Sequence, residues 1–239
     1  MHDTQSAASG DAISKARLIL FDCDGTLMDS HHHIVLVMQQ AFRDCGLPEI
    51  SPTEIGPVIG LSLTIAVQKL LPDTDESLQE AVEQRYRELY HSMPAGYDLF
   101  EGVRETLSEL RDRGYWLGVV TGKSYAGLQR VLKQFDLSEY FLVLRTPDHC
   151  ASKPHPAMVL ESMDEMGVGT QQTSVIGDAL LDIQMARAAG VRAFGVSFGV
   201  AGTEPLLAAG AVAIIDDFRD ILAHFPPLQE GQALTTIRA

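Results

Sequence analysis

The chain contains 239 residues and carries a formal net charge of −14, with 32 acidic side chains against 18 basic ones. This length suits one large domain, or one domain with a smaller inserted one. The negative charge repels nucleic acid and anionic lipid, so we expect neither as a partner. Hydrophobic residues make up 46% of the chain, which is ordinary for a globular protein with a buried core.

The cysteines indicate a reducing environment. Cys23, Cys45 and Cys150 form neither a C-x-x-C pair nor a Cys/His metal spacing, so we expect reduced thiols in a cytoplasmic protein. No run approaches the roughly 20 apolar residues of a membrane span. Residues 1–16 are small and polar without the apolar stretch of a signal peptide, and we expect them to form a flexible tail.

In chain order, the apolar run Leu18–Phe21 predicts a first buried strand that stops at Asp22. Helical patterns follow. Apolar residues recur at helical spacing from Ile34 to Phe42, over Leu63–Leu71, and from Leu78 to Met93. This block interrupts the later pattern, so residues 29–95 are interpreted as an inserted helical cap domain.

After residue 95, short apolar strands alternate with amphipathic helices. Such alternation predicts an α/β domain with a mainly parallel, Rossmann-like sheet flanked by helices, built from residues 17–28 and 96–239. The predicted strands are Trp116–Val120, Phe141–Leu144, Ser174–Ile176, Ala193–Val196 and Val212–Ile215, and the predicted helices are Val103–Leu110, Leu128–Phe135, Pro156–Met166, Ile183–Ala189 and Glu204–Ala209.

Polar residues follow the ends of these strands, where parallel sheets bind ligands. Asp22 and Asp24 are two residues apart on an extended chain, so both carboxylates are expected on one face. Asp178 follows another strand. Carboxylates that gather in this way favour a cation, and oxygen ligands suit Mg²⁺. Lys153 would add a fixed positive charge, and Thr121 stands where a helix begins, a position that suits a phosphate oxygen.

Each of these pieces has a plainer explanation when it is taken alone. D-x-D-G-T is often only a turn with capping side chains, and G-D-x-x-x-D is often a helix cap. A single Lys is usually solvated. Their combination, in one order and at the strand ends of one sheet, is far more specific.

The combination resembles the haloacid dehalogenase superfamily, over about Leu18 to Asp216. Its D-x-D-x-T motif is met by Asp22, Asp24 and Thr26. Its Ser/Thr motif is met by Thr121, its Lys motif by Lys153, and its G-D-x-x-x-D motif by Gly177, Asp178 and Asp182. The phosphoglycolate-phosphatase-like and β-phosphoglucomutase-like members have the most similar pattern, although Ala179 replaces their frequent Thr.

The resemblance implies a Mg²⁺-dependent phosphatase that hydrolyses a small phosphorylated metabolite. Asp22 would attack phosphorus and form an aspartyl-phosphate, and Asp24 would act as general acid and base. Mg²⁺ would be held by Asp22, the backbone carbonyl of Asp24, and Asp178, with Asp182 behind them. Thr121, Gly122 and Lys153 would bind the phosphoryl oxygens.

The cap is expected to set specificity by closing over the site. Candidate contacts are His31, His32 and His33, with His32 retained as the tentative one, although a solvated helix start explains any single His equally simply. Lys123 is close to the phosphate by position but is also consistent with a solvent-facing side chain. The Gly60–Ser62 segment precedes a helix whose N-terminus is expected near the substrate.

Several alternatives stay open. A β-phosphoglucomutase-type mutase would use the same core residues but needs cap cations for a second phosphate, and the cap has few: Arg43, Lys69, Arg85 and Arg87. A dehalogenase fits less well, because Asp24 suits a leaving oxygen that needs a proton. A phosphonate hydrolase would want a Schiff-base lysine, for which Lys69 is the cap's single candidate. A phosphorylation-dependent regulatory protein is a further alternative. Both a monomer and a homodimer are compatible with the sequence.

Overall fold

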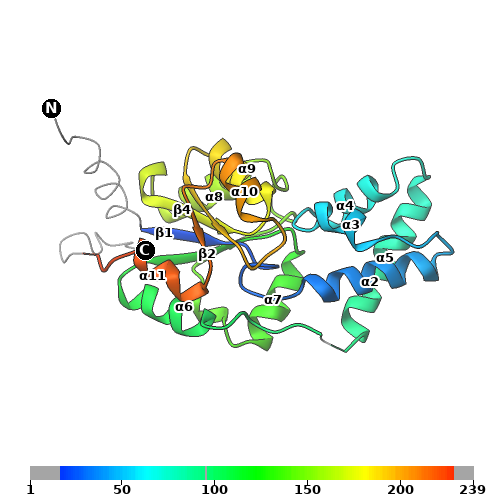
Figure 1. Ribbon diagram of the computed structural model, residues 1–239, viewed down its shortest axis with the longest axis horizontal. Helices are drawn as coiled ribbons and strands as arrows, with labels where there is room; N and C mark the ends of the chain where they lie inside the picture. Colours follow the sequence, from blue (N-terminus) through cyan, green and yellow to red (C-terminus); the bar gives the residue numbers. More distant parts are fainter. Residues whose placement is uncertain (1–16, 95, 229–239) are drawn as a thin grey trace.

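A computed structural model describes residues 17–94 and 96–228 of the chain, so the predicted tail at 1–16 lies outside the described residues. The sheet has six parallel strands in the order β3-β2-β1-β4-β5-β6. Figure 1 shows this sheet in one lobe and a group of helices in a second lobe. The strands are β1 (Leu18–Phe21), β2 (Trp116–Val120), β3 (Val143–Arg145), β4 (Thr173–Gly177), β5 (Arg192–Val196) and β6 (Ala213–Ile215).

Alternate side chains of the central strand β1 enter two different cores, because successive residues of a strand point to opposite faces. Ile19 and Phe21 pack into one apolar cluster, and Leu18 and Leu20 into the other. Helices cover both faces of the sheet (Figure 1). One face carries α6 (Val103–Asp112), α7 (Tyr125–Gln134) and α11 (Ile221–His224), and the other carries α8 (Ala157–Met166), α9 (Leu180–Ala188) and α10 (Thr203–Ala209). The predicted α/β fold class is confirmed.

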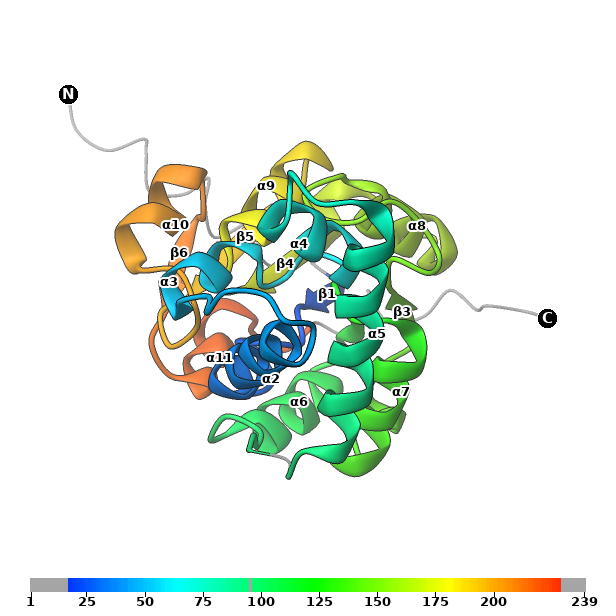
Figure 2. The same cartoon turned by 90° about the vertical axis from the view of Figure 1, so that its right-hand side faces the viewer.

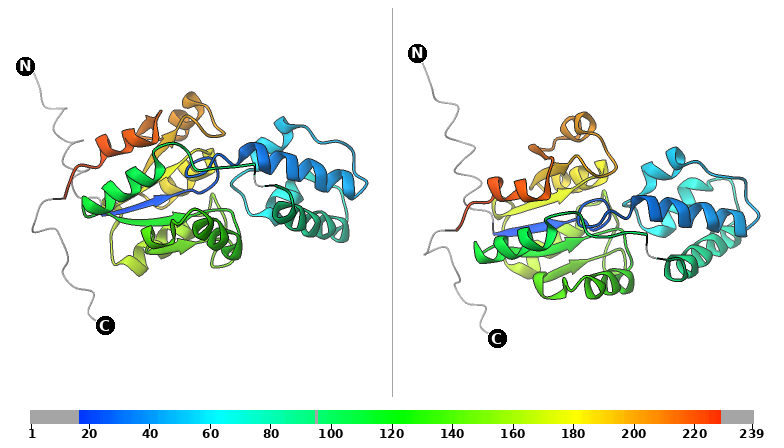
Figure 3. Two further views of the ribbon diagram at one scale, coloured as in Figure 1. Left: turned by 90° about the horizontal axis from the view of Figure 1, so that it is seen from below. Right: turned by 60° about the horizontal axis from the view of Figure 1, so that its bottom comes forward.

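The helical lobe, hereafter the cap, is built on α2 (His31–Asp44) and α5 (Glu76–Ser92), with α3 (Pro52–Ile55), a 3₁₀ turn at Gly56–Val58 and α4 (Leu63–Leu70). It has an apolar core of its own, which includes Val37 and Phe42 from α2 and Val82 and Leu89 from α5. Figure 2 views the molecule from the cap side, and Figure 3 shows the two lobes side by side. None of the helices in the described ranges is long and apolar enough to cross a membrane.

Two chain segments that lie next to each other join the cap to the α/β domain. Met28 and Leu99 form an antiparallel bridge, and the Asp29 N–H donates to the carbonyl of Asp98 at 2.9 Å. The segment that leads into the cap and the segment that leads out of it are therefore joined by main-chain hydrogen bonding.

Most predicted boundaries fall within a few residues of the observed ones, and the third strand starts two residues later than predicted. The prediction was Phe141–Leu144, whereas β3 begins at Val143. A 3₁₀ turn at Ser138–Tyr140 delays the strand, and the regular register with β2 starts at the pair Gly118 and Val143. The helix predicted at Pro156 starts at Ala157, with Pro156 as its cap residue. The helices α3 and α11, both four residues long, were not predicted.

Candidate active site

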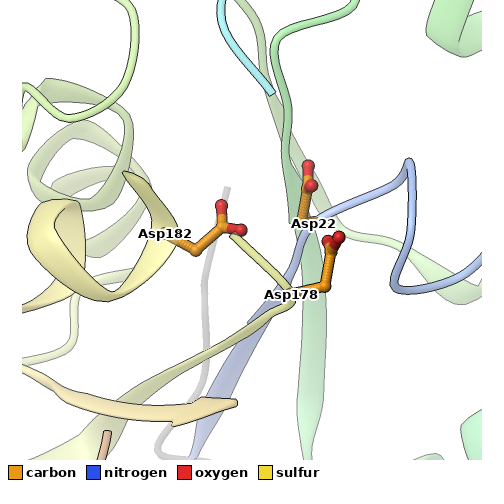
Figure 4. Close-up of side chains that lie close together, drawn as sticks. All are labelled: Asp22, Asp178 and Asp182. Atoms are coloured by element: carbon orange, nitrogen blue, oxygen red, sulfur yellow. The ribbon is translucent and has the colours of Figure 1, made fainter. Parts of the chain in front are cut away.

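Three buried carboxylates meet where two neighbouring strands end. Asp22 follows β1 and Asp178 follows β4, and the Asp22 N–H donates to the Ile176 carbonyl at 2.9 Å. Asp182 comes from the first turn of α9. One ligand oxygen from each carboxylate lies within 4.8 Å of the other two. Figure 4 shows the three side chains close together. The parallel topology thus brings together carboxylates that are about 150 residues apart in sequence.

Close packing fixes the position of Asp178. Thr26 Oγ1 donates to Asp178 Oδ1 at 3.0 Å, and the Val200 N–H donates to Oδ2 at 2.9 Å. Two glycines make room for this side chain. A Cβ at Gly25, whose φ is +82°, would lie 2.1 Å from Asp178 Oδ2, and a Cβ at Gly199 would lie 2.1 Å from Asp178 Cβ. The Gly in D-x-D-G-T therefore serves both the turn and the close approach of a carboxylate.

Lys153 is the cation of this cluster. Its side chain is fully buried, and Nζ lies 2.6 Å from Asp22 Oδ1 and 2.5 Å from Asp182 Oδ1. Burial alone would lower the pKa of Lys153, but the charges of Asp182 and Asp22 raise it, so the ammonium form is held. The prediction that Lys153 is part of the cluster agrees with this placement, whereas a solvated side chain does not.

The cluster has excess negative charge. Burial raises the pKa of Asp22 well above its usual range, against the opposing effect of Lys153, and burial together with Asp182 raises the pKa of Asp178 to about 7. Asp22 Oδ2 is buried and has no hydrogen-bond partner among the described residues. Three carboxylates facing one ammonium group, with an unpartnered oxygen between them, fit a hard divalent cation such as Mg²⁺.

Asp24 faces a different neighbourhood from Asp22. Its carboxylate stands outside the three-carboxylate cluster, and it borders a cavity on the cap side. β1 ends at Phe21, and the chain turns at Gly25, one residue after Asp24. The expectation that the Asp22 and Asp24 carboxylates share one face stays a prediction. The carbonyl of Asp24 stays a predicted metal ligand.

Asp24 Oδ1 is held from two sides. Ser30 Oγ donates to it at 2.5 Å, and Lys123 Nζ lies 2.9 Å from it. The same Nζ donates to the Tyr90 hydroxyl of α5 at 2.9 Å. Burial lowers the pKa of Lys123, but the charge of Asp24, together with Tyr90 and other neighbouring acidic groups, outweighs this effect, and the pKa is raised well above its usual value. Neither contact involves Asp24 Oδ2.

Thr121 and Gly122 follow β2, the other neighbour of β1, at the same edge of the sheet. Thr121 is buried, and its hydroxyl accepts a hydrogen bond from the Lys123 N–H at 3.3 Å. A Cβ at Gly122 would lie 2.4 Å from the carbonyl oxygens of both Gly60 and Leu61. The predicted phosphate-binding segment thus lies directly beneath the Gly60–Ser62 segment of the cap.

The structure also separates the three adjacent histidines. His32 is exposed and is not among the residues that line the cavity, so it is not brought to the site. His33 is buried instead, with its ring 4.9 Å from that of Tyr90 and 5.1 Å from that of Tyr97 between centroids. Lys123 does reach the site, but as a partner of Asp24.

Ser30 and Tyr90 were missed by sequence reasoning. Ser30 precedes a helix, so a capping role explains it, and its contact with Asp24 depends on the turn at Gly25. Tyr90 belongs to the apolar stripe of α5, and its proximity to Lys123 arises from the docking of the cap. The one sequence signal available was a polar hydroxyl within that stripe.

Comparisons with known proteins identify the family and several relatives of the chain. The model of the haloacid dehalogenase-like hydrolase family matches residues 19–196. A Dickeya dadantii protein named probable phosphatase IndB is 36% identical over 86% of this chain and 91% of its own length. A phosphoglycolate phosphatase of Photorhabdus laumondii is 31% identical over 87% of this chain and 91% of its own length.

Solved structures give the same assignment. The crystal structure of a predicted phosphoglycolate phosphatase from Haemophilus somnus is 28% identical and superposes with a TM-score of 0.81, over 87% of this chain and 97% of that chain. The fold and the site define a hydrolase with an aspartate-centred site at the carboxyl edge of a parallel sheet. The chain belongs to the haloacid dehalogenase-like hydrolase family.

Proposed function

We propose that this chain is a Mg²⁺-dependent phosphatase that hydrolyses a small phosphate monoester through a phosphorylated Asp22. The observation that carries the proposal is the buried cluster of Asp22, Asp178 and Asp182, closed by Lys153 at the carboxyl edge of the sheet. The printed names of the relatives support the phosphatase reaction and make phosphoglycolate the first substrate to test.

The residues divide the reaction between them. The Asp22 carboxylate attacks phosphorus, and the bond from phosphorus to the leaving oxygen breaks. Asp24, which borders the cap cavity, gives its proton to the leaving oxygen and later takes a proton from the attacking water. Lys153 and Thr121 bind phosphoryl oxygens. Lys153 also holds Asp22 in place through its 2.6 Å contact.

Asp22 and Asp178, with the carbonyl of Asp24, would hold Mg²⁺, while Asp182 positions Lys153. When bound, the ion would supply positive charge to the phosphoryl group during transfer. The backbone N–H of Ala179 donates to Asp182 Oδ2 at 3.0 Å, so the residue that often is Thr in similar proteins acts here through its main chain.

A mutase is the less favoured candidate. Among the four cap cations, Arg87 lines the cavity and is paired with Glu83 at 2.7 Å, while Arg85 pairs with Asp44 and Glu88 on the surface. A second phosphate would thus meet little unpaired positive charge from the cap. Lys69, the candidate for a Schiff base, is not among the residues that line the cavity.

The test is phosphate release from a panel of monoesters in Mg²⁺ and in EDTA, with Asp22→Asn as the variant. We expect release that needs Mg²⁺ and falls by at least about a thousandfold in Asp22→Asn. Asp29→Asn is the matched control, because Asp29 is an exposed carboxylate seven positions further along and should leave the rate unchanged. Turnover near the wild-type rate in Asp22→Asn would refute the nucleophile assignment.

A further inference from the structure

A large cavity lies between the two lobes on the leaving-group side of Asp24. It measures about 780 Å³ and is bordered by α2, α4 and α5 of the cap and by α7 of the α/β domain. Asp24 and Lys123 belong to its lining. A group that receives a proton from Asp24 therefore occupies this cavity. The volume suits a drug-sized ligand and is far larger than the two-carbon glycolate unit needs.

Tyrosine rings form one wall of the cavity. Tyr86, Tyr90 and Tyr97 all line it. The rings of Tyr86 and Tyr90 are 5.7 Å apart between centroids, and those of Tyr90 and Tyr97 are stacked at 6.0 Å. Lys123 Nζ lies over the Tyr90 ring, 4.7 Å from its centroid. Aromatic rings in a cavity wall favour a flat apolar partner, which they contact edge-on or through offset stacking.

Aliphatic side chains complete much of the remaining lining. Ile34 and Met38 come from α2, Ile55 and Ile59 from the following segment, and Val131 from α7. All five are buried. The lining also contains polar side chains, Ser62, Thr64 and Gln134 among them. Next to the five apolar side chains, however, a polyhydroxylated or highly charged leaving group would lose its hydration without regaining hydrogen bonds.

The cationic side chains of the lining are already engaged or exposed. Lys123 is paired with Asp24 at 2.9 Å, and Arg87 with Glu83 at 2.7 Å. Arg130 lines the cavity from α7 but is exposed to solvent. The described part of the chain thus offers no unpaired buried cation in this cavity for a second anionic group. A carboxylate or a second phosphate on the leaving group would be poorly compensated.

We infer that the cavity selects phosphate monoesters whose alcohol carries an uncharged, planar apolar ring. This inference rests on the proposed phosphatase function, because it takes Asp24 as the group that protonates the leaving oxygen. The ring stacks against the tyrosine wall while the ester oxygen stays beside Asp24. Hydrolysis then releases the ring-bearing alcohol and inorganic phosphate.

The first experiment compares esters with similar leaving-group reactivity. Benzyl phosphate, 2-naphthylmethyl phosphate and phosphoglycolate all release a primary alcohol, so binding in the cavity decides their relative rates. The kcat/KM of the two ring-bearing esters should exceed that of phosphoglycolate by roughly 10- to 100-fold, as burial of an aromatic ring predicts.

A variant that fills the cavity tests the same point. Gly127 of α7 lines the cavity, and a Cβ there meets one atom within 4 Å, Ser124 Oγ at 3.1 Å. Gly127→Phe should lower the ratio of 2-naphthylmethyl phosphate to phosphoglycolate turnover at least about tenfold. Ala126→Phe is the control, because Ala126 is an exposed neighbour outside the lining, and it should leave that ratio unchanged.

Product inhibition of the wild-type enzyme tests the inference without any substitution. We expect 2-naphthylmethanol to compete with substrate and glycolate to have no such effect at the same concentration. If phosphoglycolate is the faster substrate and 2-naphthylmethanol does not compete, the inference is overturned while the Asp22-dependent phosphatase stands. If none of the esters gives Asp22-dependent phosphate release, the proposed function and the inference both fail.

Discussion

Lys123 Nζ lies 2.9 Å from Asp24 Oδ1 and 2.9 Å from the Tyr90 hydroxyl, so one ammonium group connects Asp24, the proposed acid–base residue of the sheet domain, to helix α5 of the cap. The Tyr90 hydroxyl contacts the Lys123 ammonium group because the cap packs against the α/β domain. The arrangement of Asp24 is thereby tied to the position of the cap.

Replacement of Lys123 by Met should lower kcat/KM by about 10- to 100-fold, the usual effect of removing a residue that orients a catalytic group. The apolar stem is retained, and the charge that holds Asp24 is lost. Steady-state kinetics on benzyl phosphate measures the effect. Lys133→Met, an exposed position on α7, the helix that Lys123 precedes, serves as the control and should be neutral. An unchanged rate in Lys123→Met would mean that Ser30 positions Asp24 without help.

The stability of the metal-free protein should fall as pH rises from about 4 to about 7. Burial, reinforced by Asp182, raises the pKa of Asp178 to about 7, whereas an unfolded Asp titrates near 3.9. Between these values the folded chain keeps a proton that the unfolded chain releases, so raising the pH favours unfolding. Above about pH 7 this contribution levels off.

Mg²⁺ binds the ionised form, so it should raise Tm more at about pH 8 than at about pH 5.5. Thermal unfolding in Mg²⁺ and in EDTA at both pH values measures the difference. In Asp178→Asn the dependence of the Mg²⁺ effect on pH should weaken, and the part that comes from the raised pKa of Asp22 should remain. Equal Tm shifts at the two pH values in the wild-type protein would contradict the prediction.

Gly199→Ala should displace Asp178 and weaken Mg²⁺ binding, because the new Cβ would lie 2.1 Å from Asp178 Cβ. Overpacking of this kind costs about 1–3 kcal/mol of unfolding free energy. Calorimetric Mg²⁺ titration and denaturant unfolding report the two effects. Gly169→Ala is the matched control, since a Cβ there meets no atom within 4 Å. Wild-type Mg²⁺ affinity in Gly199→Ala would show that the loop moves aside without disturbing the site.

The sheet and its strand-end residues could be predicted because both depend on local sequence. Apolar runs such as Leu18–Phe21 mark buried strands, and parallel topology then places Asp22 and Asp178 at one edge. The start of β3 could not be predicted in this way. Phe141 is as apolar as a strand residue, and only pairing with β2 decides where regular hydrogen bonding begins.

Contacts between the cap and the α/β domain could not be predicted from local patterns. The contact of Lys123 with Tyr90 depends on how α5 docks beside the segment that precedes α7, and it joins residues more than 30 positions apart. The choice among three adjacent histidines has the same origin, because helical rotation places His33 inward and His32 outward. Side-chain direction at a domain interface is a property of the assembled structure.

The approach of the cap to the sheet at Gly122 is a contact between two stretches of main chain. The carbonyls of Gly60 and Leu61 fill the space that a side chain at 122 would need. The distance between the cap and the sheet at this depth in the molecule is therefore set by backbone atoms, which are the same in every amino acid. Side chains elsewhere in the cap can change the shape of the cavity without altering that distance. The same arrangement of residues at the edge of the sheet is therefore compatible with caps that form differently shaped cavities.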